Sequence, residues 1–237
     1  MVSDREVHRV GYDPAPWEWT PWEYAHGGRF DGRWDDPGGN WRPLYVGECA
    51  LVCYLEVLAP FRPDPTLVQE MADIVSEDND EQLYPTAKSG ELPFTWCEPR
   101  LRCSGRLSGC FALPGHSTTL PTLRKQFLEL AKTQGCEDLD AGAIRHGNRE
   151  ITQSISAWIY LCKGIDLCKG IDDDPVSGVQ DLSRHGDEFT LWAIYERDTK
   201  HSSPLQITEH ATHQRITPED PDLVHAMQIH GIVWGSD

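Results

Sequence analysis

Three residues of this 237-residue chain have the type and the setting to do chemistry: Arg29, Glu56 and Ser183. Arg29 follows Gly27 and Gly28, and glycines let a backbone come close to a phosphate that a guanidinium can bind with two hydrogen bonds. The segment is neither a Rossmann fingerprint nor a P-loop, since it does not follow a strand and open a helix. An ordinary hairpin turn with a surface arginine is therefore the alternative interpretation.

Glu56 is the only charged residue in the stretch 49–59. An ionised carboxylate in a mostly apolar helix is costly unless it has a partner or faces a cleft. Glu56 is accordingly a candidate functional acid. The alternative is that it occupies the solvated side of an amphipathic helix, and the spacing favours neither interpretation.

Ser183 lies in a turn between two predicted strands and is followed by Arg184 and His185. A Ser-His-Asp triad with His185 is a weak hypothesis, because neighbours on a turn rarely point at each other and no G-x-S-x-G motif is present. Ser183 could therefore be a plain turn serine, the nucleophile of an unrelated serine hydrolase, or a residue that binds a ligand.

The metal-binding patterns are weak. His210 and His213 are three residues apart, without the i, i+4 helical spacing and intervening glutamate of a zinc motif. The acidic stretch 76–82 lacks the spacing of a calcium loop. We expect no metal site and no cofactor.

The composition limits the kinds of partner that the protein is expected to bind. With 38 acidic and 21 basic side chains the net charge is −17, and Lys and Arg form no cluster, so nucleic-acid binding and an anionic membrane surface are disfavoured. No signal segment and no long apolar run is found, so we expect a cytoplasmic protein. The 8 cysteines form no C-x-x-C pair, and we expect reduced thiols.

The elements that must position the candidates alternate irregularly. The first 43 residues hold five tryptophans and are expected to form irregular structure over a core. Hydrophobic periodicity then predicts both strands and helices. The strands are predicted at 5–11, 44–46, 179–182 and 189–196, and the helices at 49–59, 66–75, 120–132 (capped by Ser117 and ended by Gly135) and 149–161, with a strand and a capped helix after residue 210. The hexapeptide LCKGID, present at 161–166 and again at 167–172, is interpreted as a local duplication in a loop. We expect an α+β fold in one mixed domain, 1–237.

Several of these segments occur in an order that is typical of one family. GGRFD at 27–31, LYV at 44–46 and EVLA at 56–59 are followed by QSISAW at 153–158 and by GV at 178–179 before the SRHG turn at 183–186. In this respect residues 5–196 resemble the RES-domain family, named for an arginine, a glutamate and a serine. One departure is Asp181, which stands two residues before the serine where the family has a tyrosine.

The resemblance implies a fold like that of ADP-ribosyltransferases, with 197–237 as a C-terminal extension, and activity on NAD as substrate. It further implies a bacterial toxin that cleaves the nicotinamide–ribose bond by hydrolysis or phosphorolysis, with an Xre-type antitoxin as partner. Arg29 would hold the pyrophosphate or a ribose-side oxygen. Glu56 would face the developing sugar cation or orient the attacking water or phosphate, and Ser183 would fix the ribose. Phe30 and Tyr45 would stack on the nicotinamide.

Two other activities stay open from the sequence: an ADP-ribosyltransferase acting on a macromolecule, and an NAD-binding module without catalysis. The acceptor, water or phosphate, and the oligomeric state also stay open. The charge does not argue against an anionic ligand at this site, because residues 28–42 contain three arginines and three aspartates and are locally neutral.

Overall fold

The computed structural model describes residues 2–64, 89–162, 175–197, 205–206 and 213–235. It is mixed α+β, as predicted. The chain divides into two compact units: unit 1 comprises residues 1–9, 17–48 and 104–211, and unit 2 comprises 10–16, 49–103 and 212–237. The predicted single domain stays a prediction.

The sheet of unit 1 is built around a hairpin. Strands β6 (Gly178–Ser183) and β7 (Gly186–Tyr195) pair antiparallel, and β2 (Pro43–Gly47) pairs antiparallel with the other edge of β7. The strand order is β5-β6-β7-β2-β1-β4-β8, and β5 pairs parallel with β6. The remaining bounds are β1 Val2–Tyr12, β4 Arg100–Gly109, β5 Phe111–Ala112 and β8 Leu205–Gln206.

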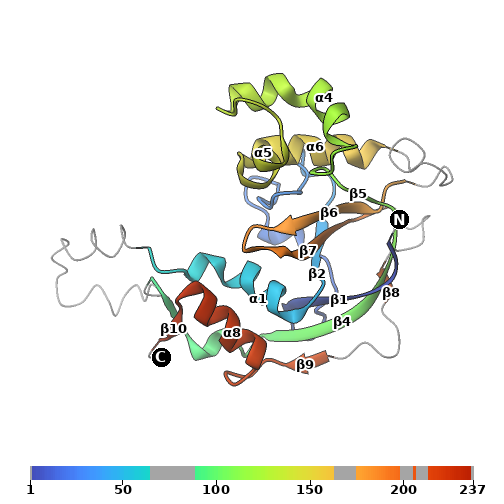
Figure 1. Ribbon diagram of the computed structural model, residues 1–237. Coiled ribbons are helices and arrows are strands. Elements are labelled where there is room, and N and C mark those ends of the chain that lie inside the picture. The colour runs from blue at the N-terminus through green and yellow to red at the C-terminus, as the bar shows by residue number, and fades with distance from the viewer. Residues whose placement is uncertain (1, 65–88, 163–174, 198–204, 207–212, 236–237) are drawn as a thin grey trace. The chain divides into compact units, whose positions relative to one another are not determined.

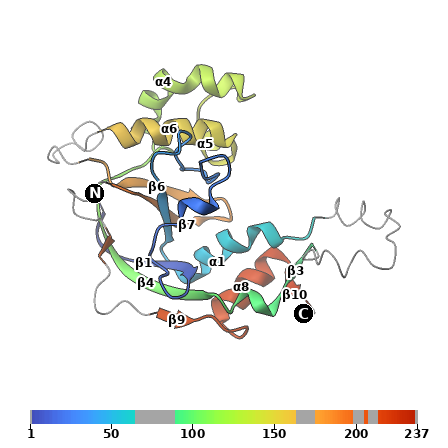
Figure 2. The ribbon, with the colours of Figure 1, turned by 180° about the vertical axis from the view of Figure 1, so that it is seen from behind.

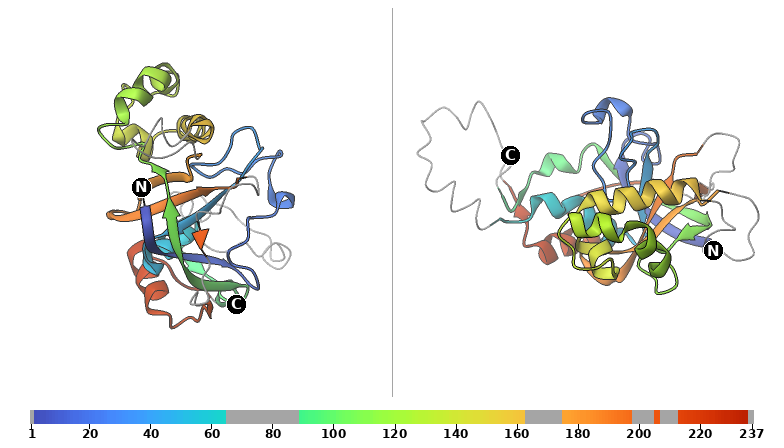
Figure 3. Two further views of the ribbon diagram at one scale, coloured as in Figure 1. Left: turned by 90° about the vertical axis from the view of Figure 1, so that its right-hand side faces the viewer. Right: turned by 90° about the horizontal axis from the view of Figure 1, so that it is seen from above.

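Three described helices lie on one side of this hairpin: α4 (Leu120–Thr133), α5 (Ala141–His146) and α6 (Arg149–Leu161), as Figures 1, 2 and 3 show. Asp140 and Asn148 cap α5 and α6, because their side chains accept hydrogen bonds from the first-turn amides of Ala143 and Glu150. The short helix η1 (Trp22–Tyr24) precedes β2.

The core of unit 1 lies between these helices and the sheet. Ile151, Ile155 and Ile159 recur at i, i+4 and i+8, so they form one apolar stripe along α6. They pack in one cluster with Val179 of β6 and Ala193 of β7. One face of the β6–β7 hairpin is therefore covered by helices.

Unit 2 is built on two helices that pack against each other, α1 (Ala50–Leu58) and α8 (Pro221–His230). Strand β9 (His213–Arg215) pairs antiparallel with the first part of β4, and β10 (Val233–Trp234) pairs parallel with β3 (Glu91–Leu92). The short helices are η2 (Ala59–Phe61) and η3 (Phe94–Trp96).

Most predicted elements are confirmed, with two corrections. Ser117 does not cap α4: the residue before the helix is Thr119, whose side chain makes no capping bond, although Gly135 does end the helix with φ +85°. Cys110 is disulfide-bonded, so the expectation of reduced thiols is wrong there. The predicted helix 66–75, the acidic stretch 76–82 and the LCKGID repeats beyond Cys162 lie outside the described residues.

Candidate functional site

Arg29 ends a tight turn in unit 1. The Arg29 amide donates a 3.3 Å hydrogen bond to the carbonyl of His26, and Gly27 and Gly28 between them have φ of +61° and +80°. Positive φ at both central positions is typical of a type I′ hairpin turn and is cheap only for glycine. The two glycines therefore set the direction of the Arg29 backbone, and the side chain is exposed.

The three arginines of segment 28–42 differ in what they bind. Arg33 Nη1 donates a 2.6 Å hydrogen bond to the Ile144 carbonyl, and Arg42 forms a two-pronged ion pair with Glu196. Within the described part of the chain, the Arg29 guanidinium forms no hydrogen bond or ion pair. Of these three cations, Arg29 is the one left for a ligand.

A buried carboxylate, Asp35, holds the loop after this turn. Asp35 is 4% exposed; one of its oxygens accepts a 2.9 Å bond from the Tyr45 hydroxyl, and the other accepts from the Gly32 amide. The Tyr45 hydroxyl also accepts from the Trp34 amide at 3.0 Å. Burial raises the pKa of Asp35 and raises the pKa of Tyr45 well above its ordinary value.

The loop is also tied to helix α6. Gln153 Nε2 donates to the Gly32 carbonyl at 3.0 Å, and Ser156 Oγ donates to the Trp34 carbonyl at 2.7 Å. Gln153 and Ser156 are buried polar residues of the QSISAW segment. This segment, which contributed to the family resemblance, thus fixes the backbone after Arg29.

Tyr45 lies on the helix-covered face of the sheet. It pairs with Ala193, which pairs on its other side with Val179. Partners across antiparallel strands share a face, and residues two apart on one strand do too. Asp181 therefore lies on the same face as Tyr45.

Asp181 forms few bonds there. Its Oδ1 accepts a 2.9 Å hydrogen bond from the Leu182 amide, which is its only hydrogen bond to a described residue. Burial raises the pKa of Asp181, and the charges of Arg33 and Arg145 oppose that rise. Asp181 is partly exposed, and its carboxylate has the capacity to accept a further hydrogen bond from a hydroxyl or amide of a ligand.

Ser183 ends strand β6 and is 1% exposed. Its Oγ accepts a 3.0 Å hydrogen bond from the His185 amide, as in a serine turn. The pairing register shifts between Leu182 and Ser183, so the alternation of faces does not extend to Ser183. The structure thus assigns Ser183 a turn-forming bond and leaves its predicted binding role untested.

Phe30 packs against Trp22, with ring centroids 5.3 Å apart and planes tilted by 36°. The Arg42 guanidinium lies over the other aromatic of this pair, 5.0 Å from the Trp22 ring centroid. Phe30 is half-buried. Its ring is therefore already engaged on one side by Trp22.

Glu56 belongs to unit 2, on helix α1. It is partly exposed, whereas Cys53, Tyr54, Leu55 and Leu58 around it are buried. Strand β2 ends at Gly47 and α1 begins at Ala50, so a two-residue link leads from Tyr45's strand into Glu56's helix. Arg29, Tyr45 and Ser183 belong to unit 1.

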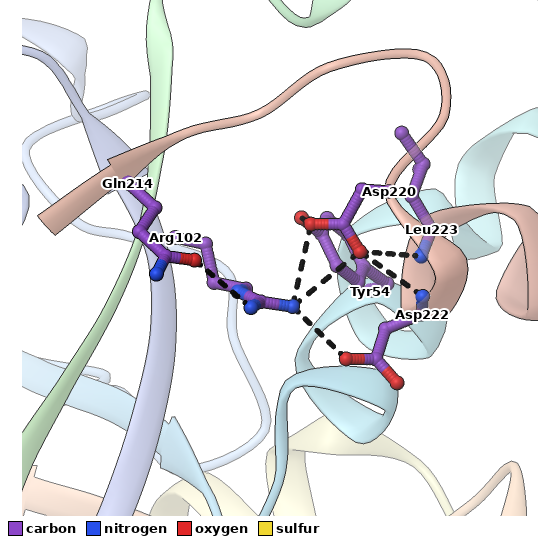
Figure 4. Close-up of polar contacts among 6 residues, drawn as sticks. All are labelled: Tyr54, Arg102, Gln214, Asp220, Asp222 and Leu223. Atoms are coloured by element: carbon purple, nitrogen blue, oxygen red, sulfur yellow. Dashed lines mark hydrogen bonds and ion pairs between the residues drawn. The ribbon is translucent and has the colours of Figure 1, made fainter. Parts of the chain in front are cut away.

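A second polar cluster, in unit 2, is shown in Figure 4. Asp220 caps α8 by accepting from the Asp222 and Leu223 amides, and it also accepts from the Tyr54 hydroxyl at 3.1 Å. Arg102 pairs with Asp220 at 3.3 Å and with Asp222 at 3.0 Å. These groups use their hydrogen-bonding capacity on one another. The cluster therefore links α8, α1 and β4, and we interpret it as structural.

No group of three or more His, Cys, Asp or Glu side chains among the described residues could hold a metal ion. No described helix is long and apolar enough to cross a membrane. Comparison with protein-family models, with curated proteins and with solved structures finds no match for the chain. The RES-domain resemblance therefore rests on the residues quoted for it.

The sequence assigned no site role to Asp35 or to Asp181, which was noted only as a departure from the family pattern. Asp35 could not be found, because its partner Tyr45 is brought to it only by the folded loop. Asp181 carried a usable signal: Val179 is apolar, and strand alternation places residue 181 on the same face as Val179.

Proposed function

We propose that the chain cleaves the nicotinamide–ribose bond of NAD, as a glycohydrolase or a phosphorylase, and that it is the toxin of a toxin–antitoxin pair. The observation that carries the proposal is Arg29: it stands in the GGR segment that resembles the RES family, on a glycine turn, exposed and without a side-chain partner among the described residues. A guanidinium so placed suits a pyrophosphate.

The chemistry needs little from the protein besides charge and position. Breaking the bond releases neutral nicotinamide and leaves a sugar cation, so no acid is needed to protonate the leaving group, in contrast to ordinary glycoside hydrolysis. Glu56 would stabilise the cation or orient the attacking water or phosphate. Ser183 would hold the nicotinamide ribose.

The Asp35–Tyr45 contact bears on the role proposed for Tyr45. Both hydrogen-bonding capacities of the Tyr45 hydroxyl are in use, donating to Asp35 and accepting from Trp34. The residue is nevertheless 36% exposed. Tyr45 is therefore suited to stacking its ring on the cationic nicotinamide and not to moving protons.

Product analysis tests the proposal. The purified protein is incubated with NAD, with and without phosphate, and the products are separated. Free nicotinamide with ADP-ribose, or with its phosphorylated form, is expected. Label from the adenine of NAD on a protein or nucleic acid would instead indicate an ADP-ribosyltransferase. A thermal shift with NAD but no turnover would indicate a binding module.

A further inference from the structure

The turn that carries Arg29, residues 26–29, has little side-chain support of its own. Gly27 and Gly28 have no side chains, and a Cβ on either would meet no described atom within 4 Å. The 3.3 Å hydrogen bond from the Arg29 amide to the His26 carbonyl closes the turn. Because glycine populates positive and negative φ about equally, the two glycines permit this conformation without enforcing it. A further contact is needed to hold the turn in place.

A second glycine, Gly39, lies directly against this turn. A Cβ at position 39 would lie 2.2 Å from the carbonyl oxygen of Gly28 and 3.7 Å from the Cα of Arg29. The first separation is far inside the contact distance of two non-bonded atoms. Gly39 also has φ +66°, which is cheap only for glycine. The close approach and the backbone conformation are thus two separate reasons for a glycine at position 39.

Asp36 holds Gly39 in position. The Asp36 side chain is buried; its Oδ1 accepts a 3.0 Å hydrogen bond from the Gly38 amide, and its Oδ2 accepts from the Asn40 amide at 2.7 Å. The Asn40 side-chain amide donates to the same Oδ2 at 3.0 Å, and the Asp36 carbonyl accepts from the Gly39 amide at 3.2 Å. One buried acid therefore binds the residues on both sides of Gly39 and Gly39 itself.

The contact at Gly28 is transmitted to Arg29 through a single rigid unit. The Gly28 carbonyl and the Arg29 amide belong to the same peptide group, which is planar. If the Gly28 carbonyl moves, the Arg29 amide turns with it, and its hydrogen bond to the His26 carbonyl is lost. The position of Gly39 therefore bears on the direction in which the Arg29 side chain leaves the backbone.

We propose that Gly39, held by Asp36, is a positioning residue that directs Arg29 toward the pyrophosphate of NAD. The inference rests on the proposed function and extends it to the residues that prearrange its arginine. Gly39 acts through Gly28 and has no ligand contact of its own. A guanidinium prearranged in this way loses less freedom when the ligand binds, and that lowers the free-energy cost of binding.

The experiment measures kcat/KM for NAD in wild type, Gly39→Ala, Arg29→Ala and the double variant. Gly39→Ala should lower kcat/KM by about 10–100-fold, as a small misplacement of a binding group does. Arg29→Ala should lower it at least about a hundredfold in wild type and less than about tenfold in Gly39→Ala, because a misdirected arginine has little left to contribute. A Gly39 that only supported the fold would leave the effect of Arg29→Ala unchanged.

Gly135→Ala is the matched control. Gly135 also has positive φ, +85°, but a Cβ there would meet no described atom within 4 Å, so the variant has the backbone strain without the contact. It should melt at a lower temperature than wild type and keep the wild-type kcat/KM. If Gly39→Ala does not fold, Asp36→Ala takes its place, since it releases Gly39 without adding an atom at position 39. The effect of Arg29→Ala should shrink in that background too.

The outcomes separate this inference from the proposed function. If wild type consumes NAD and Arg29→Ala costs the same factor in wild type as in the Gly39→Ala or Asp36→Ala background, the positioning role is wrong and the proposed function stands. If wild type binds NAD without consuming it, the proposed function is wrong, and the same comparison of dissociation constants decides the positioning role. If wild type does not bind NAD, both are wrong.

Discussion

The Tyr45 hydroxyl donates a 2.9 Å hydrogen bond to the buried carboxylate of Asp35, ten residues earlier in the chain. With the Trp34 amide donating to the same hydroxyl, this contact fixes the strand that carries Tyr45 to the loop that follows Arg29. The relationship explains how an irregular, tryptophan-rich segment keeps a defined shape.

Tyr45→Phe separates the two roles of this residue. The change keeps the ring and leaves Asp35 and the Trp34 amide without their partner, so the free energy of unfolding should fall by about 1–3 kcal/mol. NAD affinity should be nearly unchanged. Tyr45→Ala should weaken NAD binding by roughly 2- to 30-fold, the range for a lost cation–π contact. Equal NAD affinities for the two variants would contradict the stacking role.

Gly32 lies against the Asp35–Tyr45 pair and donates its amide hydrogen to Asp35. A Cβ at position 32 would lie 2.6 Å from the Tyr45 hydroxyl oxygen and 2.6 Å from Asp35 Oδ2. Gly32→Ala should therefore lower the free energy of unfolding by about 1–3 kcal/mol, as overpacking does. Gly115→Ala, whose Cβ would lie 3.8 Å from its nearest neighbour, is the control and should change stability by less than about 0.5 kcal/mol. Chemical denaturation measures both.

The sequence predicts the elements that depend on residues close together in the chain better than the contacts between residues far apart in it. Helix α6 was predicted at its observed bounds, 149–161, because its isoleucines recur at helical spacing. Strands β2, β6 and β7 were likewise predicted within three residues of their bounds. Local pattern was sufficient for these elements.

The polar contacts of the site were not predictable in the same way. Asp35 and Asp36 look like surface turn residues, yet they are 4% and 5% exposed, and Asp36 accepts from the Asn40 amide at 2.7 Å. Their burial depends on the loop closing on α6 through Gln153 and Ser156, more than a hundred residues away. No local pattern carries that information.

Asp220 should contribute more to the free energy of unfolding than Asp222, the other acid of the unit 2 cluster. Asp220→Ala removes the cap of α8 together with the bonds from Tyr54 and Arg102. We expect a loss of at least about 2 kcal/mol, about 1 from the cap and the rest from unpaired partners. Asp222→Ala removes a more exposed ion pair and should cost less than about 1 kcal/mol. Equal losses in urea denaturation would contradict this ranking.

His230 should make stability depend on pH. It is 5% exposed; its Nε2 lies 2.7 Å from the Leu55 carbonyl, and its Nδ1 accepts from Arg62 Nε at 2.9 Å. Burial lowers the pKa of His230, with the charge of Arg62 acting in the same direction. The unfolded chain therefore binds a proton at this histidine more readily than the folded chain does. The contribution of His230 to the free energy of unfolding is fully present above pH 6.5 and is lost as the pH is lowered below it.

The test compares His230→Gln with wild type in melting curves from pH 5 to 8. The variant should lose less stability between pH 7 and 5 than wild type does. His225→Gln, at an exposed position of the same helix, should keep the wild-type dependence. An identical pH profile for His230→Gln and wild type would exclude His230 as the source.

NAD turnover by the purified protein tests the central claim most directly, measured for wild type, Arg29→Ala and Glu56→Gln. Arg124→Ala is the control, because Arg124 is an exposed arginine of unit 1 that pairs with Asp138. We predict that wild type and the control release nicotinamide at equal rates and that the other two variants are at least about a hundredfold slower. No nicotinamide release by wild type, or full turnover in both Arg29→Ala and Glu56→Gln, would contradict the account.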